Sequence, residues 1–167
     1  MSFVGGKKKK LGADRNVVRY VGGASISLGP SAGEFEIGAG AFERSTKDED
    51  GLSFIERFVL AKQSKADEDE IRRILASRRS FGKTAQFAEL NVGRALEALS
   101  YFDNDFYFCE DPLPEDGERL ANPAHVLLIG LPFKGELAGS MTSELAGELL
   151  SGAVERLFPA MHPKTKK

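Results

Sequence analysis

The chain has 167 residues, which is enough for one domain with a hydrophobic core and short for two. With 41% hydrophobic residues, 29% charged residues and a net charge of −2, the composition is that of an ordinary globular protein. No apolar run approaches the roughly 20 residues of a membrane helix, and a single cysteine, Cys109, excludes an internal disulfide, so we expect a cytoplasmic protein that binds no membrane.

The charge is distributed unevenly along the chain. Residues 1–20 are strongly basic, residues 161–167 carry three lysines and no acid, and the stretch 21–160 therefore has a net charge of −10. We expect a basic flexible N-terminus over 1–14, a single domain over 15–159 and a basic tail over 160–167. Four lysines stand in one run, Lys7, Lys8, Lys9 and Lys10. This run is either a solubilising terminus or a contact with nucleic acid or an acidic partner protein.

The first half of the chain favours strands. The β-branched and aromatic stretch 16–21 ends at two glycines and predicts a strand. Alternating polar and apolar residues predict two short strands, within 25–28 and 34–37, joined by a turn at Gly29-Pro30.

Two helices are expected next. Leu52, Ile55 and Val59 have helical spacing, which predicts an amphipathic helix over about 52–62. A second helix opens at Asp67, has Ile71 and Ile74 on its apolar face, and stops near Gly82.

The second half alternates strands and helices. Strands are predicted over 87–92, 106–109 and 124–129, with a short helix over 94–99. An apolar stripe from Leu145 to Phe158 predicts a C-terminal amphipathic helix that Thr142 or Ser143 caps and Pro159 ends. The expected fold is a single α+β domain, with helices packed on a small mixed or antiparallel sheet.

Motifs of known chemistry are scarce in this sequence. The sequence has no phosphate-binding glycine loop, no zinc-protease motif and no cysteine pair, so we expect no cofactor and no metal. Cys109 is followed by Glu110 and Asp111, whose carboxylates would raise a thiol pKa, so we interpret this cysteine as structural.

His125 is the residue of most interest, because it begins an apolar strand where a polar ring must find partners. It is either a structural histidine bonded to backbone or a group that transfers protons at a strand end. The candidate catalytic residues are Arg19, Ser53 and His125, with Arg19 holding phosphate and Ser53 orienting a substrate.

The order of several short motifs resembles a widespread group of small uncharacterised bacterial proteins. These motifs are Arg19, Ala41-Phe42, Asp50-Gly51-Leu52-Ser53, Ala88-Glu89-Leu90-Asn91-Val92, Asp111-Pro112-Leu113-Pro114 and Pro123-Ala124-His125. The resemblance spans residues 15–158 and implies a bacterial, cytoplasmic single domain. It implies no particular activity, although such proteins look like accessory proteins of multi-gene systems, including defence against phage.

Two functions remain open from the sequence. The first is a non-catalytic binding or adaptor subunit of a bacterial multi-protein system, with another protein subunit as partner and nucleic acid as a further partner of the basic termini. The second is a small enzyme that acts on a nucleotide or nucleic acid through Arg19, Ser53 and His125.

Overall fold

The computed structural model describes residues 9–28, 35–43, 51–57, 65–102, 105–132, 137–138 and 141–161. Within this part of the chain, six strands form one antiparallel sheet in the order β10-β5-β1-β4-β7-β6. Their bounds are β1 Asn16–Val21, β4 Leu52–Glu56, β5 Gln86–Asn91, β6 Tyr107–Glu110, β7 His125–Ile129 and β10 Arg156–Pro159. The expected α+β domain with helices on an antiparallel sheet is confirmed.

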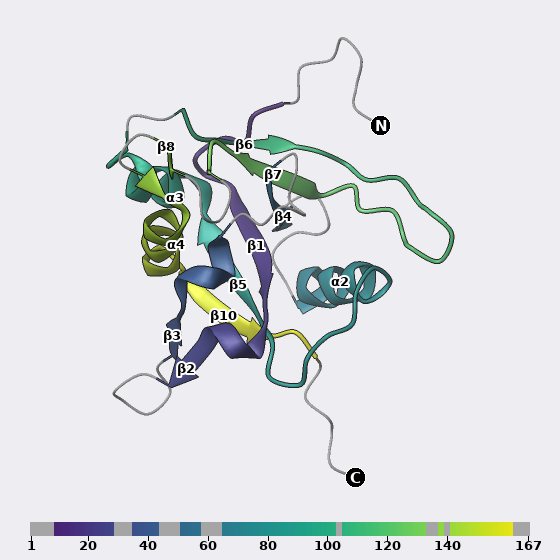
Figure 1. The fold of residues 1–167 in the computed structure, drawn as a ribbon. Coiled ribbons are helices and arrows are strands. Elements are labelled where there is room, and N and C mark those ends of the chain that lie inside the picture. Colours follow the sequence, from purple (N-terminus) through teal and green to yellow (C-terminus); the bar gives the residue numbers. More distant parts are fainter. Residues whose placement is uncertain are drawn as a thin grey trace.

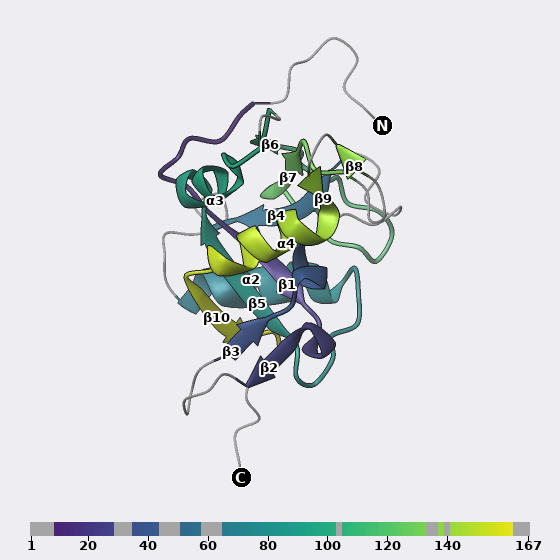
Figure 2. The ribbon, with the colours of Figure 1, turned by 60° about the vertical axis from the view of Figure 1, so that its left-hand side comes forward.

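Helices cover both faces of the sheet (Figure 1). Helix α2 lies on one face, and helices α3 and α4 lie on the other, as the turned view also shows (Figure 2). The helices are α2 Lys65–Ala76, α3 Val92–Leu99 and α4 Ser143–Gly152, and the short 3₁₀ turns are η1 Gly23–Ser25 and η2 Ala39–Phe42. Two small hairpins complete the described fold: β2 Ile26–Leu28 with β3 Phe35–Ile37, and β8 Leu137–Ala138 with β9 Met141–Thr142.

The alternation of side chains along each strand divides the core into two clusters. Leu52 and Phe54 of β4 face α4 and η2 in the larger cluster, together with Leu150 of α4. Ile55 points to the opposite face, where it packs in a smaller cluster with Ile71 of α2. A residue of β4 two positions from Ile55, such as Ser53, therefore lies on the α2 face.

The contact between α4 and η2 depends on a glycine. A Cβ atom added to Gly147 would meet the backbone oxygen of Ala39. Because Gly147 has no side chain, the helix lies close to the backbone of η2. This close approach seals the larger cluster on the α4 side of the sheet.

The helix predicted over 52–62 is wrong for its described part, because residues 52–56 form β4. The segment 52–56 is short, and short apolar runs satisfy either period. Pairing with β7 in the middle of the sheet, and β1 on its other side, buries Leu52, Phe54 and Ile55 on two faces. Residues 58–62 of the prediction lie outside the described residues.

The expected C-terminal helix is also too long, because α4 ends at Gly152 and β10 follows. The apolar stripe is divided between the two faces of the sheet: Leu150 packs in the larger cluster and Phe158 in the smaller one. One continuous helix on one face cannot reach both. The start is as expected, since the Thr142 side chain accepts a hydrogen bond from the Leu145 amide. Helix α2 likewise ends at Ala76 rather than near Gly82.

Residues 9–11 run along the edge strand β6. The Glu110 amide donates to Lys9 O, and the Leu11 amide donates to Phe108 O. Within the segment expected as a flexible terminus, these residues therefore belong to the domain. Lys9 and Lys10 are exposed, and the ammonium of Lys10 lies 4.5 Å from the ring centroid of Tyr107. Lys7 and Lys8 lie outside the described residues.

Candidate functional site

The site forms where β4, β6 and β7 lie side by side. Ile55 of β4 is opposite His125 of β7, and Ser53 is opposite Leu127. In an antiparallel pair, opposite residues share a face, so Ser53 and His125 are both on the α2 face. Asp111 follows directly after β6 and its amide donates to His125 O, which brings its side chain beside the histidine.

A tight approach places the start of β4. Gly51 has a φ of +148°, a conformation that residues with a side chain rarely adopt, and a Cβ there would meet Leu128 O at 2.8 Å. A glycine at this position lets the chain enter β4 flush against β7. Ser53 follows two residues later, which is why its hydroxyl reaches the histidine.

Hydrogen bonds connect three side chains in a continuous chain. His125 Nδ1 lies 3.1 Å from Asp111 Oδ2 and 2.8 Å from the backbone oxygen of Asp111. His125 Nε2 lies 3.1 Å from Ser53 Oγ. A backbone carbonyl only accepts, so Nδ1 carries the proton, and in the neutral ring Nε2 accepts from the Ser53 hydroxyl.

The protonation state of His125 follows from its burial. Its side chain is 11% exposed, and desolvation lowers the pKa of the ring below the ordinary 6.5, although the backbone bond and the carboxylate of Asp111 act in the opposite direction. At neutral pH the ring is therefore uncharged, and its free lone pair faces Ser53. This is the state in which a histidine can take a proton from a hydroxyl.

A pocket of about 310 Å³ opens beside this chain of hydrogen bonds. Ser53 and His125 line it together with residues of β1, the end of α2 and the loop between β6 and β7. This loop extends past the sheet on the side of α2 (Figure 1). The volume of the pocket is at the lower end of the range for small-molecule sites, about 300–1,000 Å³.

The lining of this pocket is basic, although residues 21–160 as a whole have a net charge of −10. Arg19, Arg78 and Arg79 line it, and no aspartate or glutamate does so among the described residues. Arg78 is fixed in place, because its guanidinium donates to the backbone oxygens of Leu120 and Pro114. A basic lining of this kind attracts anions, whereas the net negative charge of residues 21–160 does not.

Arg19 has a different place from the one expected. Its neighbours Val17 and Val21 belong to the larger cluster, so strand alternation directs its side chain to the face opposite His125. Nε donates to Ala41 O at 2.7 Å and Nη1 donates to Ser53 O at 2.9 Å. Arg19 thus borders the pocket where β1 and β4 diverge, and its guanidinium holds the backbone of η2 and of β4.

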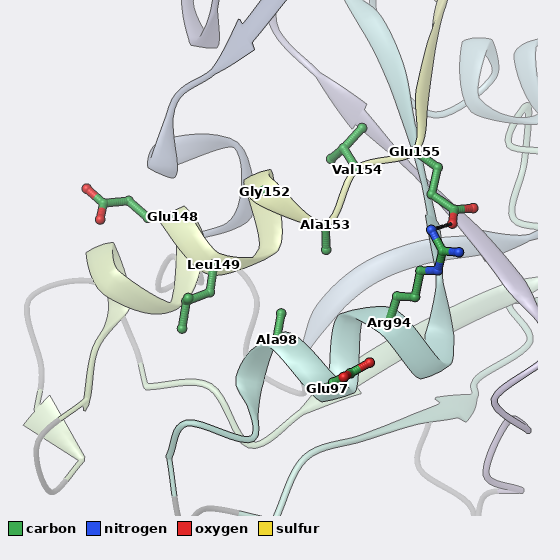
Figure 3. Close-up of a pocket in the computed structure, with 9 residues that line it drawn as sticks. All are labelled: Arg94, Glu97, Ala98, Glu148, Leu149, Gly152, Ala153, Val154 and Glu155. Atoms are coloured by element: carbon green, nitrogen blue, oxygen red, sulfur yellow. Dashed lines mark ion pairs between the residues drawn. The ribbon is translucent and has the colours of Figure 1, made fainter.

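Two further pockets lie over the end of α4 and the start of β10, and one is drawn in Figure 3. Both include Glu148 and Glu155, and in the drawn pocket Arg94 reaches Glu155 with an ion pair of 3.1 Å. Neither has a histidine, a cysteine or a chain of hydrogen-bonded catalytic groups in its lining. The pocket beside His125 is therefore the candidate site.

The remaining sequence candidates lie elsewhere. Cys109 lies on β6, opposite Leu127, and is buried, with 1% of its surface exposed. Among the residues that the structure describes, no three or more His, Cys, Asp and Glu side chains are grouped so as to hold a metal ion.

Sequence reasoning missed the contributions of Asp111, Arg78, Arg79 and Asn122 to this site. For Asp111 a signal existed, because the residue just after one strand of an antiparallel hairpin lies beside the first residue of the next strand. Arg78 and Arg79 fall near the end of the helix that is expected to stop near Gly82, and no sequence pattern indicates that this end borders a pocket.

The fold and the site together define a small α+β domain with a serine, a histidine and an aspartate hydrogen-bonded in series beside a basic pocket. Comparisons of the chain with protein families, with curated proteins and with solved structures gave no match. None of the described helices has the length and apolar character needed to cross a bilayer.

Proposed function

We propose that this protein is a small enzyme that cleaves a phosphoester substrate, with Ser53 as the nucleophile and His125 as the general base. The observation that carries the proposal is the series of hydrogen bonds from Asp111 through His125 to Ser53. It supplies a neutral base, oriented by a fixed partner and bonded to a hydroxyl, at the wall of a pocket.

The reaction proceeds in two balanced steps. Ser53 Oγ forms a bond to phosphorus while its proton moves to His125 Nε2, and the bond from phosphorus to the leaving oxygen breaks as that oxygen takes the proton back. Water then attacks the phosphoserine, with His125 again accepting and returning a proton, so that inorganic phosphate or a phosphate ester leaves and Ser53 is restored.

The basic lining supports phosphorus as the attacked atom. Negative charge collects on the phosphoryl oxygens during the transfer, and guanidinium groups stabilise it. Arg78 and Arg79 are the cations of the pocket wall on the same face as Ser53 and His125. The proposal corresponds to the second of the two functions that the sequence left open, with Ser53 attacking rather than orienting the substrate.

Reaction with a fluorophosphonate tests the proposal without knowledge of the natural substrate. Ser53 Oγ attacks phosphorus, fluoride leaves with the proton delivered through His125, and the adduct adds a fixed mass to the chain. We expect one adduct, mapped to Ser53, that is absent in Ser53→Ala and forms about a hundredfold more slowly in His125→Ala. Ser100→Ala, which changes an exposed serine at the end of α3, is the matched control.

The contrary outcome is also defined. If Ser53 reacts no faster than Ser100, or if His125→Ala leaves the rate unchanged in a variant with an unaltered far-UV spectrum, then the hydrogen-bonded chain is structural and the enzyme proposal is wrong.

A second candidate is the adaptor subunit in a multi-protein system, and the exposure of Lys9 and Lys10 beside β6 favours it. This role makes the opposite prediction for the same variants: His125→Ala keeps the function, whereas neutralising the lysine run over 7–10 weakens capture of a partner. Affinity purification of the native chain, followed by analysis of bound protein and nucleic acid, distinguishes the two.

A further inference from the structure

A buried amide without a partner lies in the wall of the candidate site. Asn122 is 1% exposed and lines the same pocket as His125, and its Oδ1 has no hydrogen-bond partner in the described part of the chain. Its backbone is well held, by a pair of hydrogen bonds with Leu113. A buried polar atom without a partner raises the free energy of the unliganded protein. A ligand that forms a hydrogen bond with this amide removes that unfavourable term and therefore gains affinity.

The chemistry of the amide restricts what can bond to it. A carboxamide offers an acceptor beside a donor, and its complement is a ligand edge that presents a donor beside an acceptor. A phosphate ester at neutral pH presents mainly acceptors and is therefore a poor partner for Oδ1. The edges of nucleobases present donors and acceptors side by side, and asparagine pairs with adenine through two such bonds.

A flat cationic surface borders the same pocket. The guanidinium of Arg79 lies over the ring of Tyr20, with its central carbon 3.7 Å from the ring centroid. Its Nε lies 3.4 Å from Ser80 O, and within the described residues its terminal nitrogens have no ion pair or hydrogen bond. Arg79 is exposed, and guanidinium planes and aromatic rings are the surfaces on which bases stack.

From these features we propose that the substrate at this site is a nucleotide, whose base stacks on the outer face of the Arg79 guanidinium and pairs with the amide of Asn122. The inference rests on the proposed function, because it names the substrate class of the Ser53 and His125 site. The basic lining provides for the phosphate, and the volume of about 310 Å³ suits one nucleotide unit rather than a length of polymer.

Calorimetric titration of the full chain with AMP, ribose 5-phosphate and inorganic phosphate tests the inference. We expect AMP to bind at least about tenfold more tightly than ribose 5-phosphate, because only AMP supplies stacking and base pairing. GMP, CMP and UMP are further arms, since each base carries a donor beside an acceptor. A dinucleotide arm shows whether the nucleotide is free or belongs to a strand end.

Variants separate the contribution of the base from that of charge. Arg79→Lys keeps the charge but removes the planar group, so it weakens AMP about tenfold and ribose 5-phosphate less than about twofold. Asn122→Leu weakens AMP similarly without lowering the melting temperature, because the buried Oδ1 atom has no hydrogen bond to lose. Arg73→Lys, an exposed change on α2 away from the pocket, is the control and leaves all affinities unchanged.

Failure of this inference is distinguishable from failure of the enzyme proposal. If no nucleotide binds more tightly than ribose 5-phosphate, or if Arg79→Lys weakens both ligands equally, the nucleotide assignment is overturned, and fluorophosphonate labelling of Ser53 can still stand. If nucleotides bind as expected and Ser53 does not label, the binding assignment stands and the catalytic role is overturned.

Discussion

His125 and Asp111 are joined twice at one ring nitrogen, by the carboxylate at 3.1 Å and by the backbone oxygen at 2.8 Å. The carbonyl cannot be removed by substitution and does not titrate in water. Both bonds require a proton on Nδ1, so either one alone maintains the tautomer that turns Nε2 toward Ser53. The orientation of the base is therefore doubly determined.

Asp111→Asn should consequently have a small effect. The backbone carbonyl still holds the Nδ1 proton, so we expect fluorophosphonate labelling of Ser53 to slow by less than about tenfold, compared with about a hundredfold for His125→Ala. Second-order labelling constants, measured by intact mass, check this. Asp116→Asn, in the exposed turn of the β6–β7 loop, is the control. If labelling of Ser53 slows as much in Asp111→Asn as in His125→Ala, then the backbone carbonyl alone does not hold the Nδ1 proton.

The pH dependence has a defined sign. Burial lowers the pKa of His125 below 6.5, so Ser53 labelling should stay constant from pH 8 to about 6.5 and fall only at lower pH. The unfolded chain takes up a proton at His125 near pH 6.5 and the folded chain does so only at lower pH, so this residue removes stability as pH falls below about 6.5. Urea unfolding of the wild type and His125→Gln at pH 7 and 5 measures the difference. A labelling midpoint above 6.5 would show that the ring is charged in the folded state.

Gly147→Ala should destabilise the protein even though alanine is the better helix former. The new Cβ would overlap Ala39 O, which forces α4 away from η2. We expect a loss of about 1–3 kcal/mol, the usual cost of overpacking. Gly152→Ala is the matched control, because nothing lies within 4 Å of its added Cβ. Chemical denaturation gives both values, and equal midpoints for the two variants would refute the close contact.

Leu150 and Leu149 should differ although they are adjacent in α4. Leu150 is 0% exposed in the larger cluster, whereas Leu149 is only partly buried and packs against it. Leu150→Ala should cost about 2–5 kcal/mol and Leu149→Ala clearly less. Thermal and urea unfolding of the two variants checks the order, and the reverse order would mean that α4 is rotated from its described position.

How much of the site the sequence predicts depends on what local pattern can encode. His125 was found because a polar residue at the start of an apolar strand is conspicuous, and the strand exists as expected. Ser53 is a sequence candidate, but the helix predicted over about 52–62 is a strand at this position, because the five residues of β4 fit both periods. The pairing of Asp111 with His125 can be inferred only after the two predicted strands on either side of the loop are taken as an antiparallel hairpin, a step that goes beyond local pattern.

The ends of the elements were harder to predict than their existence. The stripe from Leu145 to Phe158 has helical spacing throughout, yet Phe158 pairs with Phe87 in the sheet and packs on the α2 face. Tertiary pairing overrides a local preference when it buries a large aromatic side chain. Arg78 and Arg79 line the pocket because of where α2 ends and how it packs on the sheet, and local sequence pattern does not determine either.

β1 and β4 pair over two residue pairs, Val17 with Glu56 and Val18 with Ile55, whereas β1 and β5 pair over six. The sheet therefore consists of two groups of three strands, β10-β5-β1 and β4-β7-β6, which are joined only by the short pairing of β1 with β4. The pocket lies where this pairing ends. A ligand bound in the pocket contacts both groups of strands and connects them. Binding of a ligand in the pocket would then slow hydrogen exchange of the backbone amides of β1 and β4, including amides that the ligand does not contact.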